Sequence, residues 1–248
     1  AQRERYAPHA SSLVVLDDGG IFAVWFAGTA EGRDDVCIYG ARRSTEGKWE
    51  EPILLSERDG VPHWNPVLFK RKDGAVVLFY KVGKPISEWY TKVRISYDNC
   101  LTFGESVELV PGDASGGRGP VKNKPIYLSN GSILAPASTE CGEWVCFMDI
   151  SRDEGLTWTR TQEINIRPLL LQKNLDPQAR GIIQPTVWES GEGRVHALLR
   201  SSEEKVFRTD SDDYGETWGA PYAISLPNNN SGVDLDVTQN GKIVLAYN

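Results

Sequence analysis

Two kinds of polar side chain in this sequence could do chemistry, and the first kind lies in one charged loop. The segment GTAEGRDDV at residues 28–36 carries Glu31, Arg33, Asp34 and Asp35. A loop carboxylate can act as a general acid or base, and an arginine can bind an anionic group. A charged loop that only faces solvent has the same composition. Both interpretations stay open from these residues alone.

The second kind is a polar residue that recurs just before successive apolar runs. Three of the five share the phrase x-Pro-x-hydrophobic, in NPVL, KPIY and QPTV. The five are His9, Asn65, Lys124, Gln184 and Asn230. Polar residues at equivalent, convergent positions suggest a site for polyhydroxylated or anionic ligands. The alternative is that they cap strand ends and bind water.

The overall charge of the chain narrows the class of partner. Its 248 residues include 27 Lys and Arg against 34 Asp and Glu, a net charge of −7. We expect neither nucleic acid nor an anionic membrane as the main partner, because both favour a basic surface. No apolar run approaches the roughly 18 residues of a membrane span. Within this acidic chain, Lys122 and Lys124, with Arg118 nearby, could attract a carboxylate.

The four cysteines do not indicate a metal site. They show no CxxC spacing, and with three histidines in the chain no zinc constellation suggests itself. We expect buried free thiols, the alternative being a Cys141–Cys146 bridge across a hairpin. No cofactor motif appears and none is expected. A secreted or periplasmic location is slightly favoured.

An internal repeat predicts the elements that must position these residues. SRDEGLTW at 151–158 and SDDYGETW at 211–218 share the skeleton Ser-x-Asp-x-Gly-x-Thr-Trp. SYDNCLTF at 96–103 and STEGKW at 44–49 are degenerate copies. The copies start about 50–60 residues apart, a period typical of the blades of a β-propeller.

The text between the copies predicts four strands in each unit. A short apolar strand precedes a tight turn such as DDGG, KDGA or SNGS, and a β-rich run follows the turn. A third strand precedes the box and a fourth follows it. Each unit therefore reads as one four-stranded antiparallel blade, and the fold class is all-β.

The box itself predicts structure rather than chemistry. Its Asp can accept backbone N–H bonds, its Gly supplies a positive φ, and its Trp can pack between neighbouring blades. The structural residues predicted on this basis are Asp98, Asp153, Asp213, Trp158 and Trp218.

The boxes resemble the Asp-box of the sialidase-like BNR-repeat superfamily. The segments GPVKNKPIYLSNGSILAPAS and PNNNSGVDLDVTQNGKIVLAYN look like its neuraminidase-like branch. The resemblance covers essentially the whole chain and implies a sialidase-type β-propeller, six-bladed in that family. The chain shows four boxed units and the first two strands of a fifth, about four and a half blades. We therefore expect residues 1–248 to form a single sialidase-like β-propeller domain that is C-terminally incomplete.

The same resemblance implies roles for particular residues. In sialidases the loop equivalent to 28–36 presents the acid/base Asp, which points to Asp35 first and Asp34 second. Arg200, in QPTVWESGEGRVHALLR, falls on one of the three arginines that bind the substrate carboxylate. The substrate-binding candidates are Arg200, Arg33, Lys122, Lys124, Asn65 and Glu140.

The chain also departs from the family pattern. Gln184 falls where the family has the Glu that activates a Tyr nucleophile, and an amide cannot act as that base. The segment YAPHAS lacks the first arginine and has His9 close by. His9 and Gln184 therefore join Asp35 and Asp34 as catalytic candidates for this or a different glycan chemistry.

Three functions stay open, all with a glycan partner. We predict a sialidase-like exo-glycosidase acting on a terminal, acidic sugar. One alternative is a non-hydrolytic glycan-binding propeller whose Trp64, Trp89 and Trp144 contact sugar faces. The other is a different glycosidase or lyase chemistry on this fold, based on His9. An ordinary glycosidase could use Asp35 and Glu140 if they lay roughly 5–10 Å apart.

Overall fold

A computed structural model describes residues 7–172 and 180–248 of the chain. The chain divides into two compact units, residues 1–117 and 118–248, and each is described by itself. Both units are built from antiparallel β-sheets, as the alternation of short apolar runs and turns predicts. No helix in the described ranges is long and apolar enough to cross a membrane.

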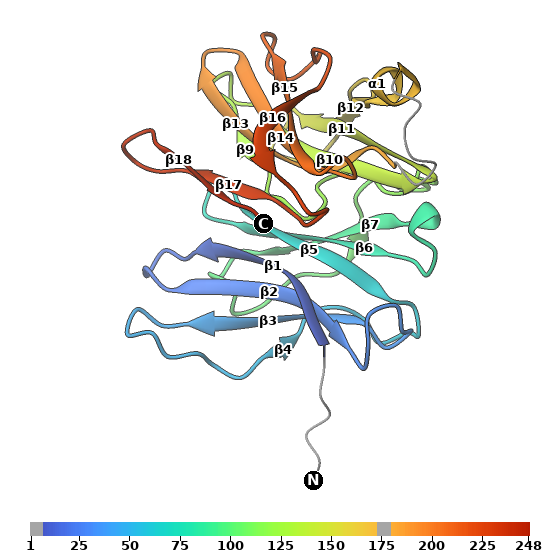
Figure 1. The fold of residues 1–248 in the computed structure, drawn as a ribbon. Coiled ribbons are helices and arrows are strands. Elements are labelled where there is room, and N and C mark those ends of the chain that lie inside the picture. The colour runs from blue at the N-terminus through green and yellow to red at the C-terminus, as the bar shows by residue number, and fades with distance from the viewer. Residues whose placement is uncertain (1–6, 173–179) are drawn as a thin grey trace. The chain divides into compact units, whose positions relative to one another are not determined.

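The first unit contains two four-stranded blades whose strands lie side by side in chain order (Figure 1). Blade 1 consists of β1 (Ala7–Val15), β2 (Ile21–Gly28), β3 (Cys37–Arg43) and β4 (Ile53–Leu54). Blade 2 consists of β5 (His63–Lys70), β6 (Val76–Val82), β7 (Tyr90–Ser96) and β8 (Val107–Glu108). A 3₁₀ turn, η1 (Ile86–Glu88), lies between β6 and β7.

The second unit contains two further blades and a hairpin. Blade 3 consists of β9 (Ile126–Tyr127), β10 (Ile133–Cys141), β11 (Glu143–Ser151) and β12 (Thr159–Arg160). Blade 4 consists of β13 (Ile182–Gly191), β14 (Arg194–Ser201), β15 (Lys205–Ser211) and β16 (Tyr222–Pro227). The short helix α1 (Arg167–Gln172) follows blade 3, and β17 (Asp234–Val237) pairs with β18 (Ile243–Ala246) after blade 4. The prediction of four boxed four-stranded units and two further strands is confirmed.

The cores form where neighbouring blades within a unit face each other. In the first unit, Phe22 of blade 1 belongs to the same buried cluster as Leu68 and Leu78 of blade 2. In the second unit, Leu134 of blade 3 lies in one cluster with Leu199 of blade 4. All seven residues of β6 are buried, because this strand is covered on both faces.

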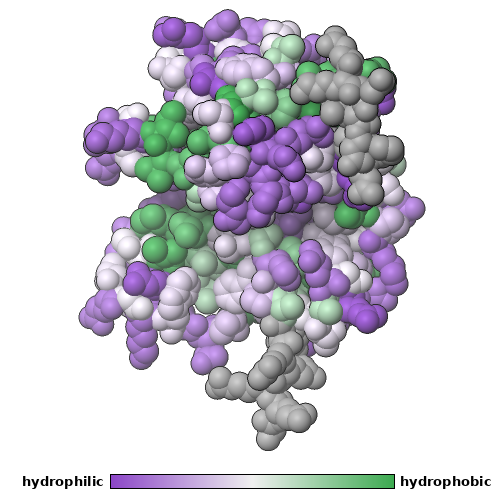
Figure 2. Space-filling view, in the orientation of Figure 1, coloured by the Kyte–Doolittle hydropathy of each residue, from purple (hydrophilic) through white to green (hydrophobic). Residues whose placement is uncertain are grey.

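Exposed apolar side chains include a group on β1 and a group on the β17–β18 hairpin. Leu13 and Val15 are exposed on β1, and Val237, Ile243 and Val244 are exposed on the β17–β18 hairpin. Figure 2 shows apolar surface, in green, over each of these elements. Both faces are left without a covering layer among the described residues.

Each Asp-box closes on itself through hydrogen bonds. Asp153 accepts bonds from the Ser151 hydroxyl (2.8 Å), the Thr157 N–H (2.9 Å) and the Thr157 hydroxyl (2.6 Å). The same three bonds recur at Asp98 and at Asp213. The Thr157 and Ser151 donors lower the pKa of Asp153 to about 2, since they stabilise the charged form.

The box tryptophans fill space at the blade contacts. Trp218 is buried and its indole N–H donates to the Gly215 carbonyl (2.9 Å). Gly215 lies against Leu134 of blade 3, so this box packs on the neighbouring blade. Trp158 makes the equivalent bond to Gly155 (3.1 Å) and is half-buried.

The innermost strands carry a bulge near the end opposite the boxes. The pairing register shifts between His9 and Ser12 in β1, between Trp64 and Val67 in β5, and between Ile183 and Thr186 in β13. One non-glycine residue in each bulge adopts the left-handed conformation, namely Ala10, Asn65 and Gln184. Such backbone costs roughly 1–3 kcal/mol per residue and is typical of functional positions.

These bulges correct the predicted positions. His9, Asn65 and Gln184 lie inside their strands, not before them. In blade 1 the left-handed residue is Ala10, the neighbour of His9, and before β9 it is Lys122, two residues before Lys124. Asn230, also left-handed, precedes β17 as predicted.

None of the four cysteines forms a disulfide. Cys37, Cys100 and Cys146 are buried, as expected, but Cys141 is exposed. Cys141 ends β10 beside the turn at Gly142, so it lies at the hairpin tip and not inside the sheet. Its register partner is Glu143, whereas Cys146 pairs with Ser138.

Candidate functional site

The candidate site in the second unit is built on the bulge at Gln184. The Gln184 backbone N–H donates to the Ser138 hydroxyl (3.1 Å). The Asn123 side-chain amide donates to the carbonyls of Gln184 and Pro185, both at 3.0 Å. Because these buried partners satisfy the distorted backbone, they hold Gln184 in its left-handed conformation (φ 54°).

Arg200 lies across from this bulge and bonds to neutral partners. It pairs with Ile183 in the β13–β14 register. Its Nη1 donates to Oε1 of Gln184 (3.2 Å), and its Nε donates to Oδ1 of Asn230 (2.9 Å). No carboxylate of the described residues lies within ion-pair distance of this half-buried guanidinium. The guanidinium is thus held in place without a direct ion pair.

Trp144, Glu140 and Arg180 surround the other side of Arg200. The guanidinium carbons of Arg200 and Arg180 lie 5.4 and 5.7 Å from the Trp144 ring centroid. Burial raises the pKa of Glu140, and the charges of Arg200 and Arg180 act in the opposite direction. Burial also lowers the pKa of Arg200, opposed by Glu140. These four residues therefore form one electrostatically coupled cluster.

Lys122 is the second cation beside Gln184. A methyl group built on Gly232 would lie 3.1 Å from Cε of Lys122 and 3.7 Å from both Nζ of Lys122 and Oε1 of Gln184. The lysine stem and the amide oxygen therefore both lie close to Gly232. Across 7–172 and 180–248, no side chain forms an ion pair with Lys122.

Lys124 and Arg118 are engaged elsewhere. The Lys124 ammonium donates to the Leu235 carbonyl (2.9 Å) and lies 3.8 Å from Asp234 and 3.6 Å from Asp236. Arg118 forms a bidentate pair with the buried Asp149. The charges of both cations are already compensated by carboxylates of the second unit, so their contacts stabilise the fold.

The candidate site in the first unit is the loop after β2. The Asp35 carboxylate accepts bonds from the Thr29 N–H (3.0 Å) and hydroxyl (3.1 Å), which orient it. Asp34 instead forms an ion pair with Lys84 at 2.9 Å. Arg33 is exposed in the same loop. Asp35 is thus held by neutral donors, while the charge of Asp34 is compensated.

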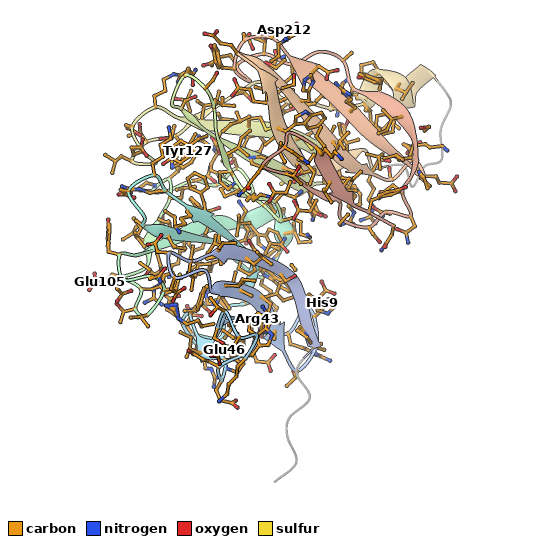
Figure 3. The ribbon with its side chains drawn as sticks, turned by 90° about the vertical axis from the view of Figure 1, so that its left-hand side faces the viewer. His9, Arg43, Glu46, Glu105, Tyr127 and Asp212 are labelled. Carbon is orange, nitrogen blue, oxygen red and sulfur yellow. The ribbon has the colours of Figure 1, made fainter. Side chains whose placement is uncertain are left out.

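His9 lies beside this loop on β1. Its ring stacks on Phe26 with centroids 5.4 Å apart, and its Nε2 lies 3.9 Å from Glu31. Its side chain is 45% exposed and accessible to a ligand. Figure 3 shows His9 at one end of blade 1, and at the other end Arg43, the last residue of β3, and Glu46 of the degenerate box.

The three tryptophans considered as sugar platforms are buried. Trp64 and Trp89 stack with centroids 5.8 Å apart, and both indole N–H groups donate to the Gly83 carbonyl. Trp144 lies beneath the two guanidinium groups described above. These rings contribute packing and support rather than an open stacking surface.

The candidates thus fall into two groups, one in each unit. The second unit brings together Lys122, Glu140, Gln184 and Arg200, whereas Asn65 belongs to blade 2 of the first unit. Asp35 and Glu140 belong to different units, and their use as a carboxylate pair stays a prediction.

Sequence reasoning missed Asn123 and Ser138, whose only signal is a polar residue within a buried stretch. The described ranges contain no group of His, Cys, Asp and Glu that could hold a metal.

Ser190, His196 and Asp210 form a further polar network in blade 4. The Ser190 hydroxyl lies 2.7 Å from Nε2 of His196, and Nδ1 of His196 lies 2.5 Å from Asp210. Arg208 and the Tyr222 hydroxyl also donate to Asp210. His196 lies four residues from Arg200, roughly 13 Å along β14. We assign this network to joining the strands of blade 4.

Comparisons with known proteins agree with this architecture. The family model described as the BNR repeat-like domain matches residues 19–248. A crystal structure of a protein of unknown function from Dyadobacter fermentans has a TM-score of 0.80 at 16% identity, covering 99% of this chain and 76% of that one. No curated protein sequence matches the chain.

Two solved sialidases show the same fold. The Hadza microbial sialidase Hz136 has a TM-score of 0.75 at 15% identity, covering 96% of this chain and 52% of its own. The NanB sialidase from Streptococcus pneumoniae has a TM-score of 0.71 at 12% identity, covering 98% and 57%. The chain therefore spans little more than half the length of these sialidases. It has the sialidase-type β-propeller fold and belongs to the family of BNR repeat-like domains.

Proposed function

We propose that this protein is a sialidase-like exo-glycosidase that acts on a terminal, acidic sugar of a glycan. The observation that carries the proposal is the state of Arg200. Its guanidinium is fixed by Asn230 and Gln184, neither of which removes its charge. A guanidinium fixed by neutral hydrogen-bond partners is suited to bidentate binding of a carboxylate.

Asp35 is the proposed acid that protonates the leaving group. The two Thr29 bonds orient its carboxylate, and the loop leaves it exposed to a substrate. A general acid must reach the glycosidic oxygen, so an exposed and oriented carboxyl group fits this role. Asp34 is the second candidate, although its pairing with Lys84 makes it less available.

The test is hydrolysis of a fluorogenic aryl glycoside of sialic acid, with neutral aryl glycosides run in parallel. We expect the wild-type protein to release the aryl group only from the acidic substrate. Asp35→Asn should abolish turnover and leave binding of free sialic acid nearly intact. Glu46→Gln, an exposed change in the degenerate box, is the control and should behave as wild type. Turnover that survives in Asp35→Asn would overturn the assignment.

Gln184 favours a second candidate, a glycan-binding propeller without hydrolysis. A glutamine cannot take a proton from a nucleophile, so the residue at this position does not supply a base. In that case the wild-type protein binds the acidic sugar but releases no aryl group from any of the glycosides. The same assay therefore separates the two candidates.

A further inference from the structure

We infer that Ser190, His196 and Asp210 form a second catalytic site, which hydrolyses short acyl esters of alcohols through an acyl-serine. The network joins the strands of blade 4, and its order of serine, histidine and aspartate is also that of a serine hydrolase triad. The inference goes beyond the proposed glycosidase and uses neither Asp35 nor Arg200.

Ser190 is the nucleophile, and a β-bulge at the end of β13 presents it. The β13–β14 register shifts between Glu189 and Gly191, so Ser190 is an extra residue without a partner on β14. The residue is exposed, and its hydroxyl lies 2.7 Å from Nε2 of His196. An exposed hydroxyl in hydrogen-bond contact with an imidazole is the arrangement that activates a serine.

His196 is the general base, and its second nitrogen decides where its proton lies. Nδ1 lies 2.5 Å from Oδ1 of Asp210. Two acceptors without a proton would repel at this distance, so Nδ1 carries the proton and the lone pair of Nε2 faces Ser190. The ring packs on Trp188 with centroids 4.8 Å apart. The bond and this packing together orient the imidazole.

Asp210 is the positioning residue that holds the imidazole. Its carboxylate also accepts bonds from Nε of Arg208 (2.8 Å) and the Tyr222 hydroxyl (2.9 Å). Burial acts to raise the pKa of Asp210, but its hydrogen-bond donors outweigh burial and lower the pKa. Nη2 of Arg208 lies 3.0 Å from Nδ1 of His196. Because a guanidinium carries donors only, it bonds the carboxylate and not the protonated nitrogen.

Arg194 supplies a cation beside the nucleophile. A methyl group built on Gly191, the residue after Ser190, would lie 3.0 Å from Nη2 and 3.4 Å from Nε of Arg194. This arginine is exposed, and among the described residues it forms no hydrogen bond or ion pair. Its donors are therefore free to bond the oxygen that becomes negative when a hydroxyl attacks an ester.

The reaction needs no co-reactant except water. Oγ of Ser190 attacks the ester carbonyl carbon and gives its proton to Nε2 of His196, while Arg194 bonds the oxyanion. The C–O bond to the alcohol then breaks, the alcohol leaves with the proton from Nε2, and an acyl-serine remains. Water attacks the acyl-serine and gives a proton to Nε2, which returns it to Oγ as the carboxylic acid leaves. We assign a short acyl group such as acetyl, because the hydroxyl is exposed at a hairpin end.

The first test is labelling of the wild-type protein with a fluorophosphonate, which bonds an activated serine oxygen through phosphorus and releases fluoride. We expect the label on Ser190, located by peptide mass spectrometry. Ser87→Ala changes an exposed serine in η1 and is the control, expected to label as wild type. Absence of the label from Ser190 would overturn the inference.

The second test is hydrolysis of p-nitrophenyl acetate. Ser190→Ala should remove the burst of p-nitrophenol and lower kcat by about 100-fold or more. Arg194→Met should slow the burst by about tenfold or more, because it removes the oxyanion donor. Asp210→Asn should lower kcat by about 100-fold and leave KM unchanged, since Asp210 acts through the imidazole and does not touch the ester.

Two outcomes of this second test contradict the inference. One is a wild-type kcat in Ser190→Ala. The other is an Asp210→Asn variant that loses stability in thermal unfolding and keeps its kcat, because the network is then structural only. Aryl acetates and aryl sialosides are separate substrates, so ester hydrolysis without sialoside cleavage refutes only the glycosidase proposal, and the reverse result refutes only this inference.

Discussion

The two ends of each blade distort the backbone in the same way but use the distortion differently. At the box end, Glu154 and Gly155 adopt positive φ, and the strained turn is closed by the Ser151, Asp153 and Thr157 bonds. At the bulge end, Gln184 adopts positive φ, and its backbone is satisfied by Asn123 and Ser138 from blade 3 and the segment before it. The box satisfies itself within eight residues, whereas the bulge needs partners from distant sequence.

The difference extends to the side chains. Both oxygen atoms of each box aspartate accept hydrogen bonds from donors within its own turn, which gives these side chains a structural role. The bulge end of the second unit instead leaves Lys122 and Arg200 without an ion pair among the residues described, although Glu140 acts electrostatically on Arg200. In the first unit, His63, at the start of β5, is fully buried with neither ring nitrogen hydrogen-bonded to a described residue. We conclude that the box end serves stability, whereas strained backbone and incompletely paired polar groups gather at the bulge end.

The largest expected effect lies near the box end of blade 3. Asp149 is fully buried and pairs with Arg118, and it also accepts the Gly119 N–H at 2.6 Å. Asp149→Ala would remove the buried carboxylate from this pair with Arg118 and should lower the free energy of unfolding by about 3–5 kcal/mol. Denaturant titration measures this. Asp212→Asn, an exposed change in the neighbouring box, should stay within about 0.5 kcal/mol of wild type.

The next effect should appear in binding and not in folding. Arg200→Ala removes the fixed guanidinium and should reduce affinity for the acidic sugar by about 100-fold, equivalent to about 2.7 kcal/mol. Arg200→Lys should recover little of this, because an ammonium cannot bond Asn230, Gln184 and a ligand in one plane. Calorimetry gives the affinities, and thermal unfolding checks that both variants fold. A loss of stability as large as that of Asp149→Ala would erase the distinction between the two ends.

A smaller effect concerns His63 and pH. Burial lowers the pKa of His63 below its ordinary value of 6.5, helped by Lys92 and opposed by Asp59 and Glu57. The unfolded chain then binds a proton that the folded chain does not, so stability should fall as the pH drops below about 6.5. His63→Phe keeps the ring contact with Tyr80 and should remove this component. The free energy of unfolding is measured against pH for both proteins. Curves that run parallel for wild type and His63→Phe would contradict this prediction.

The smallest effect is the acid response of the boxes. The pKa of Asp153 is about 2, lowered by its hydrogen bonds, so its contribution to stability is present above the unfolded value near 3.8. It should be lost as the pH falls from about 4 through 2. Asp153→Asn should be less stable at neutral pH and should lack this acid-range component. Thermal unfolding between pH 2 and 5 distinguishes the two proteins.

Most of the fold could be predicted from the sequence, because blades and boxes are local. The box at 151–158 needs only its own Ser, Asp, Gly and Thr to close, and the turn signals set each hairpin. The bulge positions were less accessible. The sequence pattern points to His9, but the residue with left-handed backbone is its neighbour Ala10. The same pattern groups Lys124 with Gln184, but the left-handed residue before β9 is Lys122. A bulge is fixed by how one strand pairs with the next, which residue type alone does not state.

The candidate site shows the same division. Arg200 and Gln184 could be named from the sequence through the family resemblance, and Asn230 from the repeated polar position. Which cations form ion pairs could not be predicted from the sequence, since Lys122 and Lys124 are the same residue type two positions apart. Only the fold places Asp234 and Asp236 beside one lysine and Gly232 beside the other.

The sequence by itself determined the blade repeat, the boxes and the residue types that a sugar-binding site would need, because each depends on short-range periodicity and turn chemistry. The tertiary structure decided which of those residues are neutralised and which keep their charge. The physical reason is that compensation of a charge depends on distances between strands far apart in the chain. Those distances follow from register and packing, and no local pattern specifies them.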